Sequence, residues 1–422
     1  MTRPPDIHID DLAAPRLPDA VRAMNDVSPD EARRRVPLDE EGLLAEAREC
    51  MGLDDFGPDD FREGLGVLLA ALEGEAELSL LGRMSARGQI VRLLSNRLLV
   101  EDVVARHPEA LARPLERPVV IVGLPRTGTS HLHNLLSAHA QLRFLPYWEA
   151  NEPVPAPGDA PVPGEPDPRI ARAQAGLDQS SALTPHQQAM HELDAWTPHE
   201  EIGFLLMAFA CSNFATLFHA PSYTEWYCRR DHTPAYAYAR RVLQVVSYLR
   251  DGGRRWVLKS PMHLENLGPL LRAYPDARVV MTFRDPARVV LSLATMTAYN
   301  RRLSARRVDP VAVGRRVAEM NQHRLRCAVR DAALVPSEQL HRVHFDAYMR
   351  DPIAAAARVL EFAGLDASDA ALEPLRRHQR EHPRGKLGRV VYRYEDVGLD
   401  PEEIRAGARD YMQAFGVARE PD

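Results

Sequence analysis

The sequence predicts an α/β fold, a parallel sheet flanked by helices with a helical extension at the N-terminus. Short segments that are apolar without interruption recur along the chain, as is typical of strands buried on both faces of a parallel sheet. Most of them are followed by a segment whose apolar residues have helical spacing. Strands that alternate with helices indicate a parallel sheet covered on both faces.

The predicted strands are residues 119–122, 256–258, 279–283 and a segment near 343–345. Helices are predicted after the first three, over residues 132–139, over residues 264–274 and from about Pro286. Between the first two strands lies a long insertion at about residues 146–250. It begins with a proline-rich surface loop, 146–168, and residues 197–200 read as a capping box that starts a buried helix over 202–218.

The part of the chain before the first strand has a different character. Residues 1–30 are rich in proline and aspartate, which predicts an extended arm, whereas residues 40–109 show helical spacing. We therefore predict a helical extension, residues 1–112, that packs on a core domain formed by residues 113–422.

The composition excludes several classes of protein. A formal net charge of −6 argues against a nucleic-acid partner, which requires clustered positive charge. No apolar run approaches the roughly 18 residues of a transmembrane segment, and the first residues do not resemble a secretory signal. The four cysteines are scattered, as expected of reduced thiols. Together these features predict a cytoplasmic protein.

The loop after the first strand, residues 123–130 (GLPRTGTS), predicts a phosphate site. It has the glycine and Ser/Thr spacing of a Walker A motif, but Thr129 stands where that motif has lysine. Glycines let successive amides turn toward an anion at the start of the next helix. Without the lysine, a triphosphate bound to magnesium is poorly served, whereas a single 5′-phosphate is well held. A kinase that uses ATP remains an alternative, as does a glycine turn with no ligand.

At these residues the chain resembles the sulfotransferases that use 3′-phosphoadenosine 5′-phosphosulfate (PAPS), in particular the branch with the loop PR[ST]GT[ST]. The resemblance covers about residues 118–365 and implies a P-loop-like sulfotransferase core. It implies that the 5′-phosphosulfate is bound by Pro125, Arg126, Thr127, Gly128, Thr129 and Ser130. The second family signature is an arginine followed eight residues later by a serine, here Arg284 and Ser292, and it implies a site for the 3′-phosphate. A late basic glycine loop in the family closes over the 3′-phosphate and adenine. Arg384 and Lys386 are its counterparts here, with a solvated loop as the alternative.

The resemblance also suggests the chemistry. Sulfuryl transfer between oxygens is in line, so the protein mainly positions the reactants and stabilises charge. Lys259, one of only two lysines in the chain, is predicted to stabilise the leaving oxygen, and Arg126 to hold the sulfonate together with the loop amides. Glu149 is the preferred base for the acceptor hydroxyl, and His263 is its rival. No metal is implied.

The acceptor is predicted to be a small hydrophobic molecule or a lipid bound by aromatic residues of the insertion, unless those residues are core. The aromatic residues are Trp196, Phe204, Phe209, Phe214, Tyr223 and Trp226. A protein that binds the product 3′-phosphoadenosine 5′-phosphate (PAP) without catalysis is a further alternative. A homodimer is also left open.

Overall fold

A five-stranded parallel sheet forms the centre of the protein. The structure is a computed structural model that describes residues 4–159, 164–250, 253–383 and 385–421. The strands run in the order β3-β6-β2-β7-β8, and neighbours are parallel. Their bounds are β2 Val119–Val122, β3 Leu142–Arg143, β6 Arg255–Lys259, β7 Arg278–Phe283 and β8 Leu340–His344. The four predicted strands are present, and the predicted α/β fold is confirmed.

The register of the sheet brings three predicted segments to one edge. Ile121 of β2 is paired with Lys259 at the end of β6, and Val122 with Met281 of β7. The chain segments that follow β2, β6 and β7 therefore all leave the sheet at its carboxyl edge, where ligands bind in open α/β sheets.

Both faces of β2 are buried. Val119 and Ile121 pack in a cluster with leucines of α6 and α18, while Val120 and Val122 belong to the largest cluster of the core. The helices that follow the strands are α6 Thr129–Ser137, α14 Leu267–Ala273, α15 Pro286–Arg301 and α18 Pro352–Ala363. Helix α15 begins where the sequence predicts, because the Asp285 side chain accepts a hydrogen bond from the amide of Ala287 and proline occupies the first helical position.

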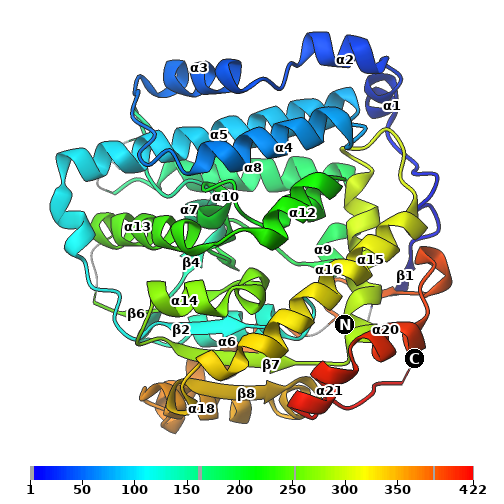
Figure 1. Ribbon diagram of the computed structural model, residues 1–422. Helices are drawn as coiled ribbons and strands as arrows, with labels where there is room; N and C mark the ends of the chain where they lie inside the picture. The colour runs from blue at the N-terminus through cyan, green and yellow to red at the C-terminus, as the bar shows by residue number, and fades with distance from the viewer. Residues whose placement is uncertain (1–3, 160–163, 251–252, 384, 422) are drawn as a thin grey trace.

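The N-terminal helices form a layer away from the sheet (Figure 1). They are α1 Asp19–Asn25, α2 Pro29–Arg35, α3 Glu40–Met51, α4 Phe61–Gly74 and α5 Leu80–Arg106. The expected extended arm over residues 1–30 is wrong for residues 19–25 and 29–30, which are helical. Ser28 accepts from the amide of Glu31 and precedes a proline, which is a helix start that the aspartate and proline content concealed.

A buried arginine joins this layer to the insertion. Arg97 of α5 is fully buried and donates to the carbonyl oxygens of Phe56, Pro58 and Met207 at 3.0, 2.8 and 3.1 Å. Loss of the guanidinium would leave three buried carbonyls without these donors, so Arg97 fixes how the two segments pack.

The insertion contains seven helices among the described residues. They are α7 Tyr147–Asn151, α8 Pro168–Leu183, α9 Gln187–Met190, α10 Ile202–Leu206, α11 Asn213–Leu217, α12 Pro221–Arg229 and α13 Thr233–Leu249. The continuous helix predicted over 202–218 is wrong. The chain bends between α10 and α11, where Phe209 has a φ of +50°. Gly64 of α4 lies directly against this bend, since a Cβ there would be 2.3 Å from the Phe209 carbonyl oxygen.

The described chain after α15 packs on α15, on α6 and on β8. Its elements are α16 Pro310–Asp331, α17 Phe345–Arg350, α19 Asp369–Glu381, β9 Arg389–Val391, α20 Pro401–Gly407 and α21 Arg409–Phe415. Strand β9 pairs in parallel with β1, Asp6–His8. No helix within the described ranges has the length and apolar character that a bilayer span requires.

Candidate active site

The loop between β2 and α6 has the shape of an anion site. Gly128 adopts a left-handed conformation, with φ +89°, at the N-terminus of α6. Gly123 lies tightly against β7, because a Cβ at this position would be 2.0 Å from Thr282 Oγ1. Thr127 Oγ1 lies 2.7 Å from both the Leu124 carbonyl oxygen and Thr282 Oγ1, which holds the turn closed. The loop amides at the helix start are thus positioned for a negatively charged group.

Arg284 lies beside this loop. Its Nη1 donates to the carbonyl oxygen of Arg126 at 2.7 Å, and its guanidinium stacks 3.8 Å from the centre of the Phe345 ring. Arg284 follows β7 and the loop follows β2, so the pairing of adjacent strands brings the two predicted phosphate contacts together.

Ser292 of α15 also contacts the phosphate loop. Arg126 Nε donates to Ser292 Oγ at 3.0 Å, and its two terminal nitrogens contact the Met190 carbonyl oxygen and the Tyr392 hydroxyl. Arg126 has a φ of +68°, which is unusual for a residue with a side chain. Helix α15 and the phosphate loop therefore share a contact through Arg126.

A carboxylate from the C-terminal segment already contacts Arg284. Glu420 accepts two hydrogen bonds from the guanidinium, at 2.7 and 2.9 Å. Its backbone is held by Asp285, which accepts from the Glu420 amide at 2.8 Å, and by Arg405, which donates to the Glu420 carbonyl at 3.0 Å. The position next to the loop is thus one in which a bidentate oxyanion is bound.

Lys259 lies at the opposite side of the loop from Arg284, at the end of β6. Its Nζ donates to Ser130 Oγ at 3.2 Å and forms an ion pair with Glu200. The Lys259 side chain is 3% exposed and that of Glu200 is 16% exposed, so the carboxylate is the partner that solvent or a substrate reaches.

A second carboxylate holds the backbone of Lys259. Glu201 accepts from the Lys259 amide at 3.0 Å and also contacts His263 Nε2, while His263 Nδ1 lies 2.8 Å from the Tyr236 hydroxyl. Burial acts to raise the pKa of Glu201, but His263 and the Lys259 amide hold it below the usual value. Both ring nitrogens of His263 are occupied, and the side chain is almost fully buried.

The comparisons with known proteins agree with this geometry. The model of the sulfotransferase family matches residues 118–369, more than half of the chain. The protein belongs to the sulfotransferase family. It is similar to the sulfotransferase STF1 from Mycobacterium tuberculosis, with 30% identity and a TM-score of 0.74 over 88% of this chain and 98% of that one. The sulfotransferase STF9 from Mycobacterium avium shares the fold, with 24% identity and a TM-score of 0.81 over 91% and 98% of the two chains. No curated protein sequence matches the chain significantly.

Uncharged histidines surround the lysine of this sulfotransferase. Burial and the nearby Lys259 ammonium lower the pKa of His133 and of His199 to about 3. The same two causes lower the pKa of His191 to about 3. At neutral pH these rings are therefore neutral, and the positive charge at this side of the loop is that of Lys259.

Glu149 belongs to a different ion pair from that of Lys259. It lies in the short helix α7 with its side chain 2% exposed, and its carboxylate is paired with Arg250 Nη1 at 2.6 Å. Burial raises the pKa of Glu149, partly offset by Arg250. The structure brings Glu200, and not Glu149, into contact with Lys259.

Sequence reasoning missed Glu200, because residues 197–200 were expected to cap a helix. Instead Thr197 Oγ1 donates to Asp194, and β5 (Pro198–His199) pairs with β4 (Leu145–Pro146) in an antiparallel ladder. This ladder carries Glu200 and Glu201 to the end of β6. The signal that the sequence offered for a carboxylate at this site is the pair of adjacent glutamates, Glu200 and Glu201.

The late basic loop is only partly described. Arg384 lies outside the described residues. Lys386 is 45% exposed at its side chain and lies 3.8 Å from Glu192. The same segment leads through β9 to Tyr392, whose hydroxyl contacts Arg126, so this stretch of chain does approach the phosphate loop.

The aromatic residues of the insertion are mostly interior. Phe204, Phe209, Phe214 and Tyr223 are fully buried; the Phe209 and Phe214 rings are stacked, and Tyr223 meets Phe214 edge to face. Trp196 is the exposed one, at 55%. Most of these aromatic residues therefore belong to the core, which was the alternative to an acceptor pocket. The described residues contain no cluster of three or more His, Cys, Asp or Glu suited to a metal ion.

Proposed function

We propose that this sulfotransferase moves a sulfuryl group from PAPS to a hydroxyl group of a small-molecule or lipid acceptor, with PAP as the product. The observation that carries the proposal is the position of the Lys259 ammonium, between Ser130 of the phosphate loop and the accessible carboxylate of Glu200. A cation, an anion-binding loop and a base thus meet at one point.

Each group has a role that its contacts support. The loop amides of residues 127–130 and the Arg126 guanidinium hold the phosphosulfate. Lys259 donates to the oxygen that bridges sulfur and phosphorus, which gains negative charge as its bond to sulfur breaks. The acceptor oxygen forms the new bond to sulfur and gives its proton to a base.

We propose Glu200 as that base in preference to Glu149 and His263. Glu200 contacts Lys259 and is partly exposed, whereas Glu149 is buried against Arg250. His263 is fixed between Glu201 and Tyr236, which supports a role in positioning the Lys259 strand end rather than in proton transfer.

The donor is tested by comparing nucleotides. PAP alone is expected to raise the melting temperature of the protein more than ADP with Mg²⁺ does. A charged hydrogen bond of about 1.5–3 kcal/mol to the 3′-phosphate should give PAP at least a tenfold advantage over ADP in affinity. The companion measurement is sulfuryl transfer from labelled PAPS. Equal stabilisation by ADP–Mg²⁺, or phosphoryl transfer from ATP, would favour the kinase alternative.

Glu420 and Arg284 give a second test of the same donor. Because Glu420 neutralises Arg284, the change Glu420→Gln is expected to strengthen PAP binding, and Arg284→Gln to weaken it by roughly tenfold to a hundredfold. AMP, which lacks the 3′-phosphate, should respond far less to either change.

The matched control for Glu420→Gln is Glu403→Gln, which removes one exposed negative charge of α20. Calorimetric titration with PAP and with AMP measures all four proteins. Equal effects of Arg284→Gln on PAP and AMP would show that Arg284 does not read the 3′-phosphate.

A further inference from the structure

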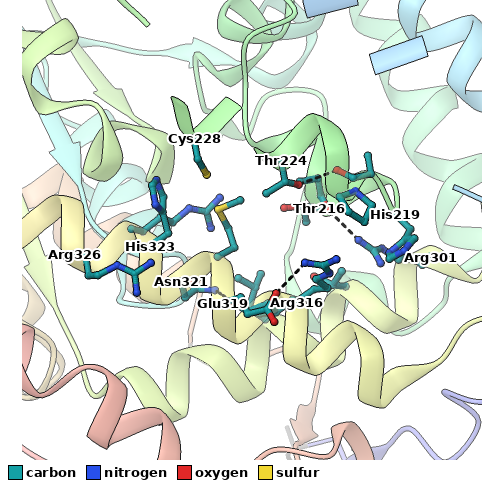
Figure 2. A pocket seen from close by; sticks show the side chains of 18 residues that line it. Thr216, His219, Thr224, Cys228, Arg301, Arg316, Glu319, Asn321, His323 and Arg326 are labelled. Carbon is teal, nitrogen blue, oxygen red and sulfur yellow. Dashed lines mark hydrogen bonds and ion pairs between the residues drawn. The ribbon is translucent and has the colours of Figure 1, made fainter. Parts of the chain in front are cut away.

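A cavity lies between the insertion and two helices of the core, α15 and α16. It has a volume of about 230 Å³ and is bounded by the α11–α12 segment, α15 and α16. Figure 2 shows Arg326 and His323 toward one end of it and Arg301 and His219 toward the other. Its described lining includes none of the groups that we assign to sulfuryl transfer.

Arg324 Nε in its lining has no hydrogen bond but lies 3.6 Å from Glu265 Oε1. Three further buried polar atoms of the lining have no hydrogen-bond or ion-pair partner within the described part of the chain. They are Thr297 Oγ1, Arg301 Nε and Asn321 Oδ1, on side chains of residues that are 2%, 8% and 1% exposed. Nearly all buried polar groups in folded proteins have a partner. Three exceptions at one cavity indicate that something polar completes them.

Water would satisfy the hydroxyl and the amide but would leave a charge uncompensated. Arg301 donates to the carbonyl oxygens of Ala215 and Phe218, at 2.8 and 3.0 Å, and both acceptors are neutral. Within the described ranges no carboxylate lies within ion-pair distance of Arg301. Burial and the neighbouring Arg316 lower the pKa of Arg301 to about 10, so it is still charged at neutral pH.

The rest of the lining adds to the positive charge. It contains Arg316, Arg324 and Arg326, against one carboxylate, Glu319, which is paired with Arg316 at 3.0 Å. Arg324 is buried near Glu265, with Nε and Oε1 3.6 Å apart. The unpaired Arg301 therefore makes the cavity suited to an anion.

We propose that this cavity binds the oxyanion group of a small molecule, a carboxylate or a sulfate, with Arg301 Nε and Thr297 Oγ1 as donors. Asn321 Oδ1 accepts from a neighbouring hydroxyl or amine of the same ligand. The oxyanion is either an acidic group on the acceptor or a free oxyanion. Arg324 contacts Met262 Sδ at 3.6 Å, so the cavity lies next to the turn that follows Lys259.

The experiment uses two probes, 4-iodobenzoate and inorganic sulfate, titrated calorimetrically against the full chain in chloride buffer. Whichever probe binds to the wild-type protein, both Arg301→Gln and Thr297→Val are expected to weaken its binding. The expected loss of affinity for Arg301→Gln is roughly tenfold. The control Arg315→Gln removes an exposed charge of helix α16, which also borders the cavity, but Arg315 itself is not part of the lining, so binding should be unchanged.

Thr297→Val adds a readout that distinguishes a binding role from a structural one. Replacing an unpartnered buried hydroxyl with a methyl group of the same shape should raise the melting temperature of the free protein while weakening the probe. If Arg301→Gln does not fold, this variant alone decides the proposal. In crystals, the iodine of 4-iodobenzoate should give an anomalous peak in the cavity.

The outcomes separate the sources of the oxyanion. If 4-iodobenzoate raises the apparent KM for the acceptor, it competes with the acceptor, and the acidic group belongs to the acceptor. If 4-iodobenzoate changes kcat but not the KM for the acceptor, the cavity binds a separate effector. Binding of sulfate alone would indicate a free oxyanion. Absence of binding by both probes at millimolar concentration, or binding that neither substitution weakens, overturns the proposal. PAP titrations of the same variants test the donor site separately. Unchanged PAP binding would show that a failure of the cavity proposal does not affect the proposed sulfuryl transfer.

Discussion

Replacement of Lys259 by methionine is expected to lower kcat by roughly a hundredfold to a thousandfold while PAP still binds. The methionine keeps an unbranched stem of similar length but removes the ammonium that lies between Ser130 and Glu200. That charge matters most when the bridging oxygen becomes negative, so its loss should affect the chemical step more than binding of the donor. Single-turnover transfer from labelled PAPS at saturating acceptor measures the effect.

The control for this variant is Lys259→Arg. It keeps the positive charge but places a planar guanidinium where a compact ammonium stands, so partial activity is expected. A Lys259→Met protein that retains more than a tenth of the wild-type kcat would remove Lys259 from the mechanism.

Glu200→Gln is expected to lower kcat by roughly 10² to 10⁴-fold, the range for loss of a general base. Glutamine keeps the shape and still accepts a hydrogen bond from Lys259 but cannot take a proton. Glu149→Gln is the matched comparison, since it makes the same chemical change at the buried carboxylate paired with Arg250. It should lower the melting temperature and leave kcat near the wild-type value.

The reverse result, loss of activity with Glu149→Gln and retention with Glu200→Gln, would return the role of base to Glu149. The double variant Lys259→Met, Glu200→Gln adds a further check. Because the two side chains are in contact, its loss of activity should be smaller than the product of the two single losses.

The phosphate loop and Arg284 were predictable because their signals are local. A buried apolar strand, a glycine that can adopt a positive φ and a helix start are each recognised from consecutive residues. Arg284 and Ser292 are eight residues apart, at the end of one strand and in the helix that follows it. The same holds for α15, whose start is set by Asp285 and Pro286.

The errors arose where distant segments decide the local conformation. The expected helix over 202–218 is interrupted at Phe209, where α4 packs against the bend. This close contact is possible because Gly64 of α4 has no side chain. The α2 helix was missed because composition outweighed a capping serine in the prediction.

The sequence by itself determined the class of fold, the anion-binding loop and the lysine at the end of β6, since each depends on residues adjacent in the chain. The tertiary structure decided which carboxylate meets Lys259. That choice rests on the pairing of β4 with β5, two-residue strands about fifty positions apart, and on the ion pair that holds Glu149 against Arg250. Such contacts between distant segments form only when the chain folds, because the free energy that selects them comes from packing and not from local propensity.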